Sequence, residues 1–231
     1  MEKIIFHKET KTFHLYNEEI SYIMCVLENG HMGQLYYGKR IHDKPDFSYL
    51  VEKCGRPMTS YIFEGDRSFS LEHIRQEYPV YGTTDYRHPA IEIMQENGSN
   101  ISEFKYVGYE ILKGKPSLKG LPATYTESEE EAETLKVILK DNLTGAKLTL
   151  LYTIFSKGSA IARSAHICNE GEKVLHLQTM MSLNLDLPDK DYVWMQLSGA
   201  WSRERYVKNR ILEQGITAID SMRGNSSHEH N

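Results

Sequence analysis

Two segments hold the charged and aromatic residues best placed to do chemistry. The first covers residues 63–89 and the second residues 199–205, and both combine arginine with acidic and aromatic side chains. A guanidinium presents a planar fork of donors that can bind two sugar hydroxyls or a carboxylate, and an aromatic ring can stack on the apolar face of a pyranose. Internal ion-paired braces and ligand contacts are both open interpretations. The residues concerned are Asp66, Arg67, Asp85, Tyr86, Arg87, Trp201, Arg203, Glu204 and Arg205.

Other catalytic patterns are missing from the sequence. It contains no G-x-S-x-G elbow, P-loop, G-x-G-x-x-G or H-E-x-x-H string. The nearest metal-like string is His228-Glu229-His230, which ends the chain without a third ligand nearby, whereas metal sites need three or four. We therefore expect no metal and no cofactor, and a cupin-like metal enzyme using His228 and His230 is the least favoured alternative.

Short alternating runs separated by polar, glycine-containing turns predict a β-sandwich that positions these segments. A long irregular stretch, residues 41–90, interrupts the strands, and such long loops are usually functional. Within it, Ser70 is expected to cap a short helix over Leu71–Glu77. The acidic run 127–133 is expected to be a solvated turn. The expected strands are 13–16, 20–27, 32–37, 90–95, 104–113, 123–127, 133–141, 147–156, 160–169, 174–186 and 192–197.

Composition limits the classes of partner. The 231 residues carry 27 basic and 32 acidic side chains, a net charge of −5, so no basic face for nucleic acid is expected. No apolar run approaches the roughly 18 residues of a membrane helix or the core of a secretory signal, so we expect no membrane partner. The odd and widely spaced Cys25, Cys54 and Cys168 fit reduced thiols in the cytoplasm.

Four strings in these segments and around them carry a family resemblance. They are QEYPVYGTTDYRHPA (76–90), KGLPATY (119–125), LSGAWSRER (197–205) and SMRGNSSHEHN (221–231). In this order they resemble the N-terminal domain of the bacterial glycoside hydrolase family 36 α-galactosidases, over essentially the whole chain. The resemblance implies an all-β fold, an antiparallel β-supersandwich of the galactose-mutarotase type, with at most one or two short helices.

The resemblance also implies a function for a larger protein. Such enzymes are retaining α-galactosidases that release terminal galactose from melibiose, raffinose and stachyose, using two aspartates on a (β/α)₈ barrel that follows the N-terminal domain. Residues 1–231 contain no Lys-Trp-Asp nucleophile string and no strand-helix alternation for a barrel. We therefore expect a noncatalytic domain, truncated at its C-terminal end, that is inactive alone and has its own barrel and a homo-oligomer as partners. Strands left without neighbours would expose an edge that pairs with another copy.

Individual roles carry over at few positions. Arg67 lies in a D-R-S-F-S-L string whose arginine reaches toward the galactoside in similar enzymes, and Glu52 could replace a family aspartate that has no clean match here. Asp66, the Asp85-Tyr86-Arg87 triplet and the Trp201, Arg203 and Arg205 string are expected at an interface or at the pocket rim. The alternative from another class is a free-standing, lectin-like β-sandwich that binds carbohydrate by itself.

Overall fold

The computed structural model describes residues 3–120, 123–188, 190–200 and 202–220. The chain forms two compact units, Met1–Asp186 and Leu187–Asn231, which are described separately. Strands dominate both, and the described helices are two three-residue 3₁₀ turns, η1 at Ser48–Leu50 and η2 at Glu129–Glu131. The all-β prediction with at most two short helices is confirmed. No described helix is long or apolar enough to cross a membrane.

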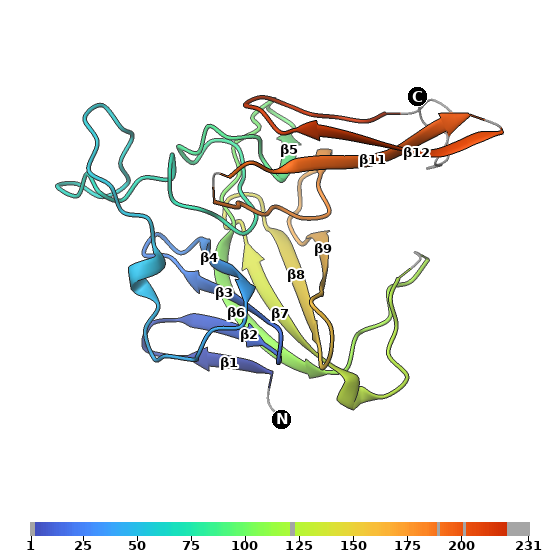
Figure 1. Cartoon of the computed structure of the whole chain (residues 1–231). Helices are drawn as coiled ribbons and strands as arrows, with labels where there is room; N and C mark the ends of the chain where they lie inside the picture. The colour runs from blue at the N-terminus through green and yellow to red at the C-terminus, as the bar shows by residue number, and fades with distance from the viewer. Residues whose placement is uncertain (1–2, 121–122, 189, 201, 221–231) are drawn as a thin grey trace. The chain divides into compact units, whose positions relative to one another are not determined.

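The first unit contains two four-stranded antiparallel meanders (Figure 1). The strand order follows the sequence in both sheets; polar turns join most neighbouring strands, whereas residues 114–131 join β6 to β7. The first sheet is β1 (Ile4–His7), β2 (Thr12–Tyr16), β3 (Ile20–Val26) and β4 (Met32–Lys39). The second sheet is β6 (Lys105–Lys113), β7 (Ala132–Lys140), β8 (Ala146–Phe155) and β9 (Ile161–Asn169).

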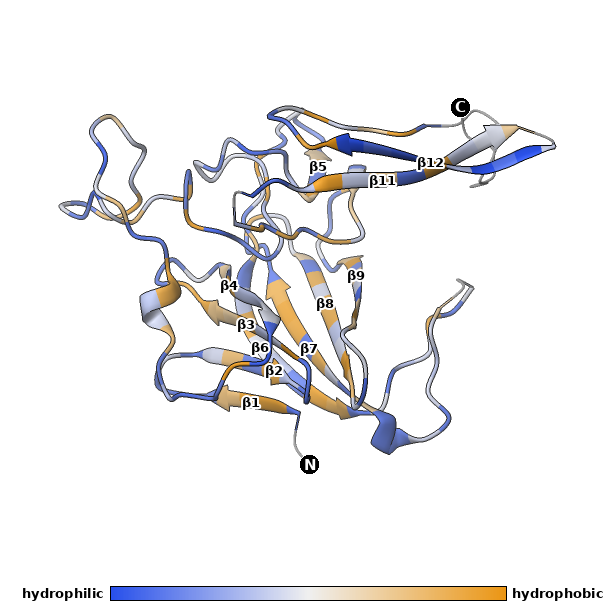
Figure 2. Cartoon of the chain, in the orientation of Figure 1, coloured by the Kyte–Doolittle hydropathy of each residue, from blue (hydrophilic) through white to orange (hydrophobic). Residues whose placement is uncertain are grey.

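The two sheets share one hydrophobic core. Phe13 and Tyr22 from the first sheet and Leu148 and Tyr152 from the second belong to a single cluster of buried side chains. Alternate residues of β7 and β8 are buried, and both strands show apolar colouring along their length (Figure 2). The period-two pattern therefore places one face of each strand in the core, as expected for a sandwich.

A third ladder and a long loop complete this unit. Strand β5 (Ile91–Gln95) pairs with β10 (Leu175–Met180), and Ile91 and Ile93 extend the core. Residues 41–90 contain no described strand and only η1, as the density of proline and glycine predicted. A second buried cluster, including Phe47, Phe69 and Leu71, fixes this loop against the first sheet.

The helix predicted over Leu71–Glu77 is wrong. Ser70 begins a single turn, accepting a backbone hydrogen bond from Ile74, but the chain then extends alongside β4. There the backbone N–H of Gln34 donates to the Arg75 carbonyl (3.1 Å), and the backbone N–H of Glu77 donates to the Met32 carbonyl (2.9 Å). Pairing with the edge of β4 satisfies the same backbone groups that a helix would use, so the local capping signal loses to tertiary contacts.

Other boundaries differ from the sequence prediction for identifiable reasons. Residues 123–126 form no strand, and Tyr125 is 79% exposed with no neighbouring strand to cover it. The strand expected over 174–186 stops at Met180, because the following segment makes polar contacts with the long loop and with β4. Strand β1 was not expected, since its three apolar residues are few, but it pairs along β2.

The second unit is a hairpin of β11 (Val193–Ala200) and β12 (Arg203–Ile211). Of the segment expected as a loop at 199–205, Gly199 and Ala200 lie at the end of β11, and Arg203 and Arg205 lie on β12. Sequence reasoning missed β12 because charged residues dominate it. The exposed apolar side chains of one hairpin face are Val193, Met195, Leu197, Val207 and Ile211.

Candidate functional site

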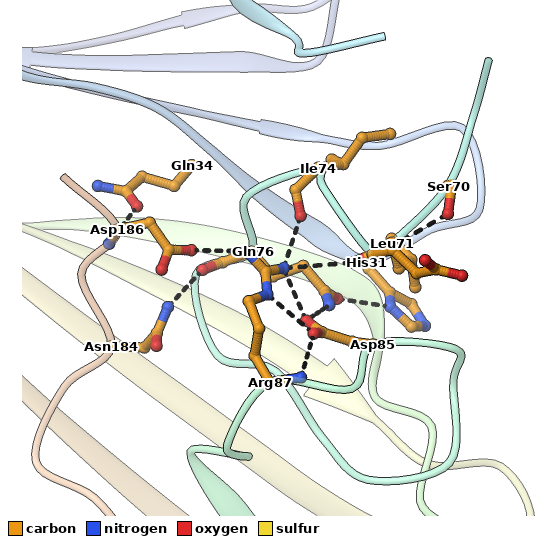
Figure 3. A network of polar contacts seen from close by, with 11 residues as sticks. His31, Gln34, Ser70, Leu71, Ile74, Gln76, Asp85, Arg87, Asn184 and Asp186 are labelled. Carbon is orange, nitrogen blue, oxygen red and sulfur yellow. Dashed lines mark hydrogen bonds and ion pairs between the residues drawn. The ribbon is translucent and has the colours of Figure 1, made fainter. Parts of the chain in front are cut away.

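An ion pair between Asp85 and Arg87 lies at the centre of the long loop (Figure 3). The Asp85 carboxylate is buried and accepts from Nε and Nη2 of Arg87 at 2.8 and 2.7 Å. The same Nη2 donates to the carbonyls of Leu71 and Ile74. Nη1 of Arg87 lies 3.3 Å from Asp186. One guanidinium thus ties three parts of the chain together, as its five fixed donors allow.

The electrostatics keep Arg87 charged. Desolvation works to lower the pKa of Arg87, but hydrogen bonds and charges from Asp85, Asp186 and Glu52 outweigh it, so the pKa lies above its ordinary value. Glu52, expected to help bind substrate, is exposed, and of these causes its charge contributes least to the raised pKa of Arg87. Buried carboxylates and guanidinium groups are tolerated when paired in this way.

A relay of hydrogen bonds leads from this pair to a buried histidine. The Nε2 amide of Gln76 donates to Asp85 at 2.7 Å, and Oε1 of Gln76 lies 3.0 Å from Nδ1 of His31. Asn184 donates its amide to the Gln76 carbonyl, which holds the relay against the segment after β10 (Figure 3). Gln76, Asp85 and Arg87 of the string QEYPVYGTTDYRHPA therefore lie in one connected polar network.

A second ionic cluster lies inside the sandwich and was missed by sequence reasoning. Glu77 is fully buried and accepts from the hydroxyls of Tyr22 (2.7 Å) and Tyr152 (2.8 Å) and from Nη2 of Arg163 (3.1 Å). Burial raises the pKa of Glu77, and Arg163 and the two hydroxyls oppose that rise. Burial and the Glu77 charge raise the pKa of both tyrosines well above its ordinary value, so they remain neutral donors.

The predicted substrate-binding residue Arg67 lies apart from these clusters. It is exposed, just after a two-residue turn closed by a bridge between Phe63 and Asp66. Asp66 accepts from the backbone and hydroxyl of Ser68 and so shapes the turn that presents Arg67. An exposed guanidinium at the end of such a turn is accessible to a ligand.

The remaining predicted residues fall into two groups. Tyr86 is 76% exposed, and its hydroxyl contacts that of Ser60 at 3.2 Å, although Asp85 and Arg87 on either side are paired. Arg203 and Arg205 are exposed on β12. Trp201, His228 and His230 lie outside the described residues. Of the predicted residues, the structure thus brings Asp85 and Arg87 into direct contact.

A serine, a histidine and an aspartate form a triad-like chain at the edge of the first sheet. Nδ1 of His14 lies 2.7 Å from Asp43, and Nε2 lies 2.9 Å from the hydroxyl of Ser21. That hydroxyl oxygen also accepts from the backbone of Ile41 (3.0 Å), and both Ser21 and His14 are fully buried. A buried serine oxygen cannot attack a substrate, so we assign these hydrogen bonds a structural role. They join β2, β3 and the segment after β4. Among the described residues, no group of His, Cys, Asp and Glu is arranged to hold a metal ion.

We expect stability to fall as the pH drops below about 6.5. Burial lowers the pKa of His14 and of His31, against the opposing effects of Asp43 and Gln76 respectively. The unfolded chain then binds more protons than the folded chain below the ordinary histidine pKa, and each histidine contributes a slope of up to about 1.4 kcal/mol per pH unit. The lowered pKa of Asp43 affects only more acidic solutions.

Urea unfolding at pH 7.5, 6.5 and 5.5 measures this loss. The variant His14→Gln should lose less stability over the same interval, because one of the two titrating groups is gone. His88→Gln, at an exposed position, is the matched control and should keep the slope of the unchanged chain. Equal slopes in the chain and in His14→Gln would contradict the assignment to His14.

The fold and the site define an antiparallel β-sandwich domain whose long loop is fixed by buried ion pairs and presents an exposed arginine. Residues 30–231 match the glycosyl hydrolase family 36 N-terminal domain, and the chain belongs to this family. The sequence prediction of that family is thereby confirmed.

Known relatives are α-galactosidases several hundred residues longer. Alpha-galactosidase AgaA of Geobacillus stearothermophilus is 42% identical over 228 residues, which cover 99% of this chain and 31% of that protein. The structure of AgaB from the same organism has a TM-score of 0.89 at 41% identity, and that of an α-galactosidase from Lactobacillus brevis has 0.92 at 38% identity. They cover 100% and 98% of this chain and 31% of each enzyme. The chain therefore spans about a third of the relatives that it matches.

Proposed function

We propose that this chain is the noncatalytic N-terminal domain of a retaining α-galactosidase that hydrolyses terminal α-galactosides. The observation that carries the proposal is the match of 99% of the chain to 31% of an α-galactosidase, at 42% identity, together with the match to the family's N-terminal domain. Retaining hydrolysis needs two carboxylates about 5–5.5 Å apart, one as nucleophile and one as acid and then base. In this proposal both come from a barrel outside residues 1–231.

Raffinose and stachyose are the proposed substrates, together with melibiose. Variants of AgaA from Geobacillus stearothermophilus have been crystallised with raffinose and with stachyose. Arg67 would donate hydrogen bonds to sugar hydroxyls at the pocket rim, and Glu52 would accept from them. The exposure of both side chains supports this role.

Docking to the barrel and assembly into a homo-oligomer belong to the same proposal. The exposed apolar face of the β11–β12 hairpin supports a binding partner for the second unit, since exposed apolar patches usually mark protein interfaces. The cytoplasm is the proposed location, supported by three free cysteines. Sedimentation of the purified chain tests assembly, and a strictly monomeric chain would count against it.

We expect Arg67→Ala to lower kcat/KM about tenfold or more in the protein encoded by the complete reading frame. Loss of a charged hydrogen-bond donor to a substrate costs about 1.5–3 kcal/mol. The measurement is hydrolysis of raffinose and of p-nitrophenyl α-galactoside. Arg56→Ala, another exposed arginine of the same loop, is the control and should keep full activity. A reading frame without a barrel after Asn231, or full activity in Arg67→Ala, would overturn the corresponding part of the proposal.

A further inference from the structure

A pocket of about 350 Å³ lies on the first unit, where two turns and η2 come together. The β2–β3 turn, the β8–β9 turn and η2 form its walls, and the residues just before β1 and just after β4 complete them. The volume lies within the range of small-molecule sites, which is about 300–1,000 Å³. All of these elements lie outside the long loop.

Hydrogen bonds fix the two turns to each other. The side-chain amide of Asn17 donates to the carbonyls of Phe155 and Gly158, at 2.9 Å each. The Glu19 carboxylate accepts from the backbone N–H of Gly158 (3.0 Å) and from the hydroxyl of Ser159 (2.6 Å). The walls are therefore held in place before any ligand binds, which lowers the free-energy cost of binding.

The protein itself occupies several acceptors of the lining. Oδ1 of Asn17 accepts from two backbone N–H groups of its own turn, at 2.8 and 2.9 Å. The Glu130 carbonyl accepts from Nζ of Lys3 (3.2 Å) and from the hydroxyl of Ser156 (2.8 Å). An ammonium group has three donors, so Lys3 keeps two of them for a ligand.

Three cationic side chains line the pocket, those of Lys3, Arg40 and Lys157. The Arg40 guanidinium lies over the ring of Tyr16, another lining residue, 5.3 Å from the ring centroid, and this cation–π contact orients its donors. Arg40 and Lys157 are exposed, and within the described part of the chain neither forms an ion pair. Their donors are therefore accessible to a ligand.

The balance of charge and donors favours an anionic group. Three positive side chains line the pocket against two negative ones, Glu18 and Glu130. An ionised phosphate group offers acceptor oxygens to several donors at once, and a guanidinium can bind two of those oxygens. A neutral sugar would instead need free acceptors as well as donors, since each of its hydroxyls does both.

We propose that this pocket binds a phosphate group, either as inorganic phosphate or as the phosphate monoester of a small molecule. The Arg40 guanidinium donates two hydrogen bonds to its oxygens, and the ammonium groups of Lys3 and Lys157 donate from the other walls. The site consists of residues of this chain and depends neither on Arg67 nor on galactoside hydrolysis.

The experiment is calorimetric titration of the chain with sodium phosphate and with glucose 6-phosphate. At least one probe should bind at one site per chain, and more weakly in about 500 mM than in about 50 mM NaCl, because salt screens exposed charges. Tighter binding of glucose 6-phosphate would identify a monoester as the ligand, and binding no tighter than that of phosphate would identify inorganic phosphate. Absence of binding by both probes at the lower salt concentration would overturn the proposal.

Three variants test the residues. Arg40→Gln should weaken binding about tenfold or more, because it removes a charged pair of donors, and Lys157→Gln should weaken it by a similar factor. Glu18→Gln should tighten binding, since it removes a negative charge from the lining. Lys173→Gln is the matched control, because Lys173 is exposed beyond the opposite end of β9, and it should bind as the unchanged chain does.

Two results with the variants would overturn the proposal. One is unchanged affinity in both Arg40→Gln and Lys157→Gln, which should fold normally because both positions are exposed. The other is an equal loss of affinity in Lys173→Gln, which would show binding by surface charge in general. Phosphate binding is measured on this chain and Arg67→Ala by hydrolysis in the longer protein, so each proposal can fail without the other.

Discussion

Replacing Arg163 by methionine should lower the free energy of unfolding by about 3–5 kcal/mol. Arg163 is the only cation in hydrogen-bond contact with the fully buried Glu77 among the described residues. Removing it leaves a carboxylate inside the sandwich with two tyrosine hydroxyls but no compensating charge. A loss of this size is comparable to half the stability of an ordinary domain.

Urea unfolding of four chains separates the pair from its parts. The double variant Glu77→Gln with Arg163→Met should recover part of the lost stability, because no charge then remains buried without a partner. Lys136→Met is the control, since Lys136 forms an exposed pair with Glu110 and should contribute less than about 1 kcal/mol. If Arg163→Met lowers the free energy of unfolding no more than Lys136→Met does, the Glu77–Arg163 pair does not stabilise the sandwich.

Replacing Asp85 by asparagine should cost about 2–3 kcal/mol, the range for hydrogen bonds to a charged group. The two side chains have nearly the same shape, but the asparagine amide replaces one acceptor oxygen with an N–H donor. That donor would face the N–H donors of Arg87 or of Gln76. Arg87 would also lose its nearest charge partner. The loss should be smaller than for Arg163→Met, because the Arg87 side chain is 35% exposed and water can replace part of the contact.

Urea unfolding again gives the magnitude, and Asp46→Asn is the matched control. Asp46 is exposed and, within the described part of the chain, accepts only from Ser48, so its replacement should change stability by less than about 1 kcal/mol. Asp85 can only accept hydrogen bonds, so it directs the amide nitrogen of Gln76 toward itself and Oε1 of Gln76 toward His31, whose Nδ1 then carries the proton. In Asp85→Asn the Gln76 side chain can take either orientation, so ¹⁵N spectra should show His31 protonated at either nitrogen. A stable variant with His31 still protonated only at Nδ1 would contradict the relay.

Much of the sandwich could be predicted from local patterns. The alternation along 133–141 and 147–156 identified β7 and β8 within a few residues, because each strand has one buried face. The helix at 71–77 and the strand at 123–127 failed because their outcome depends on neighbours. One segment found the edge of β4, and the other found no strand to pair with.

The candidate site was predictable in its composition but not in its connections. The Asp85-Tyr86-Arg87 string suggested an ionic brace, and the structure shows Asp85 paired with Arg87. Glu77 and Arg163 gave no comparable signal, since 86 residues separate them. An arginine inside the otherwise alternating strand 160–169 was the one available indication that a buried partner existed.

The contacts that join the two sheets have a consequence for the order of folding. Each meander is built from strands adjacent in sequence, whereas Asn17 bonds to Phe155 across 138 residues and Glu77 meets Arg163 across 86. Loops of that length close slowly compared with hairpins. We therefore expect each sheet to acquire protection from hydrogen exchange early in refolding. Closure of the sandwich around Glu77 would then be the late step, during which the apolar faces of both sheets are open to aggregation.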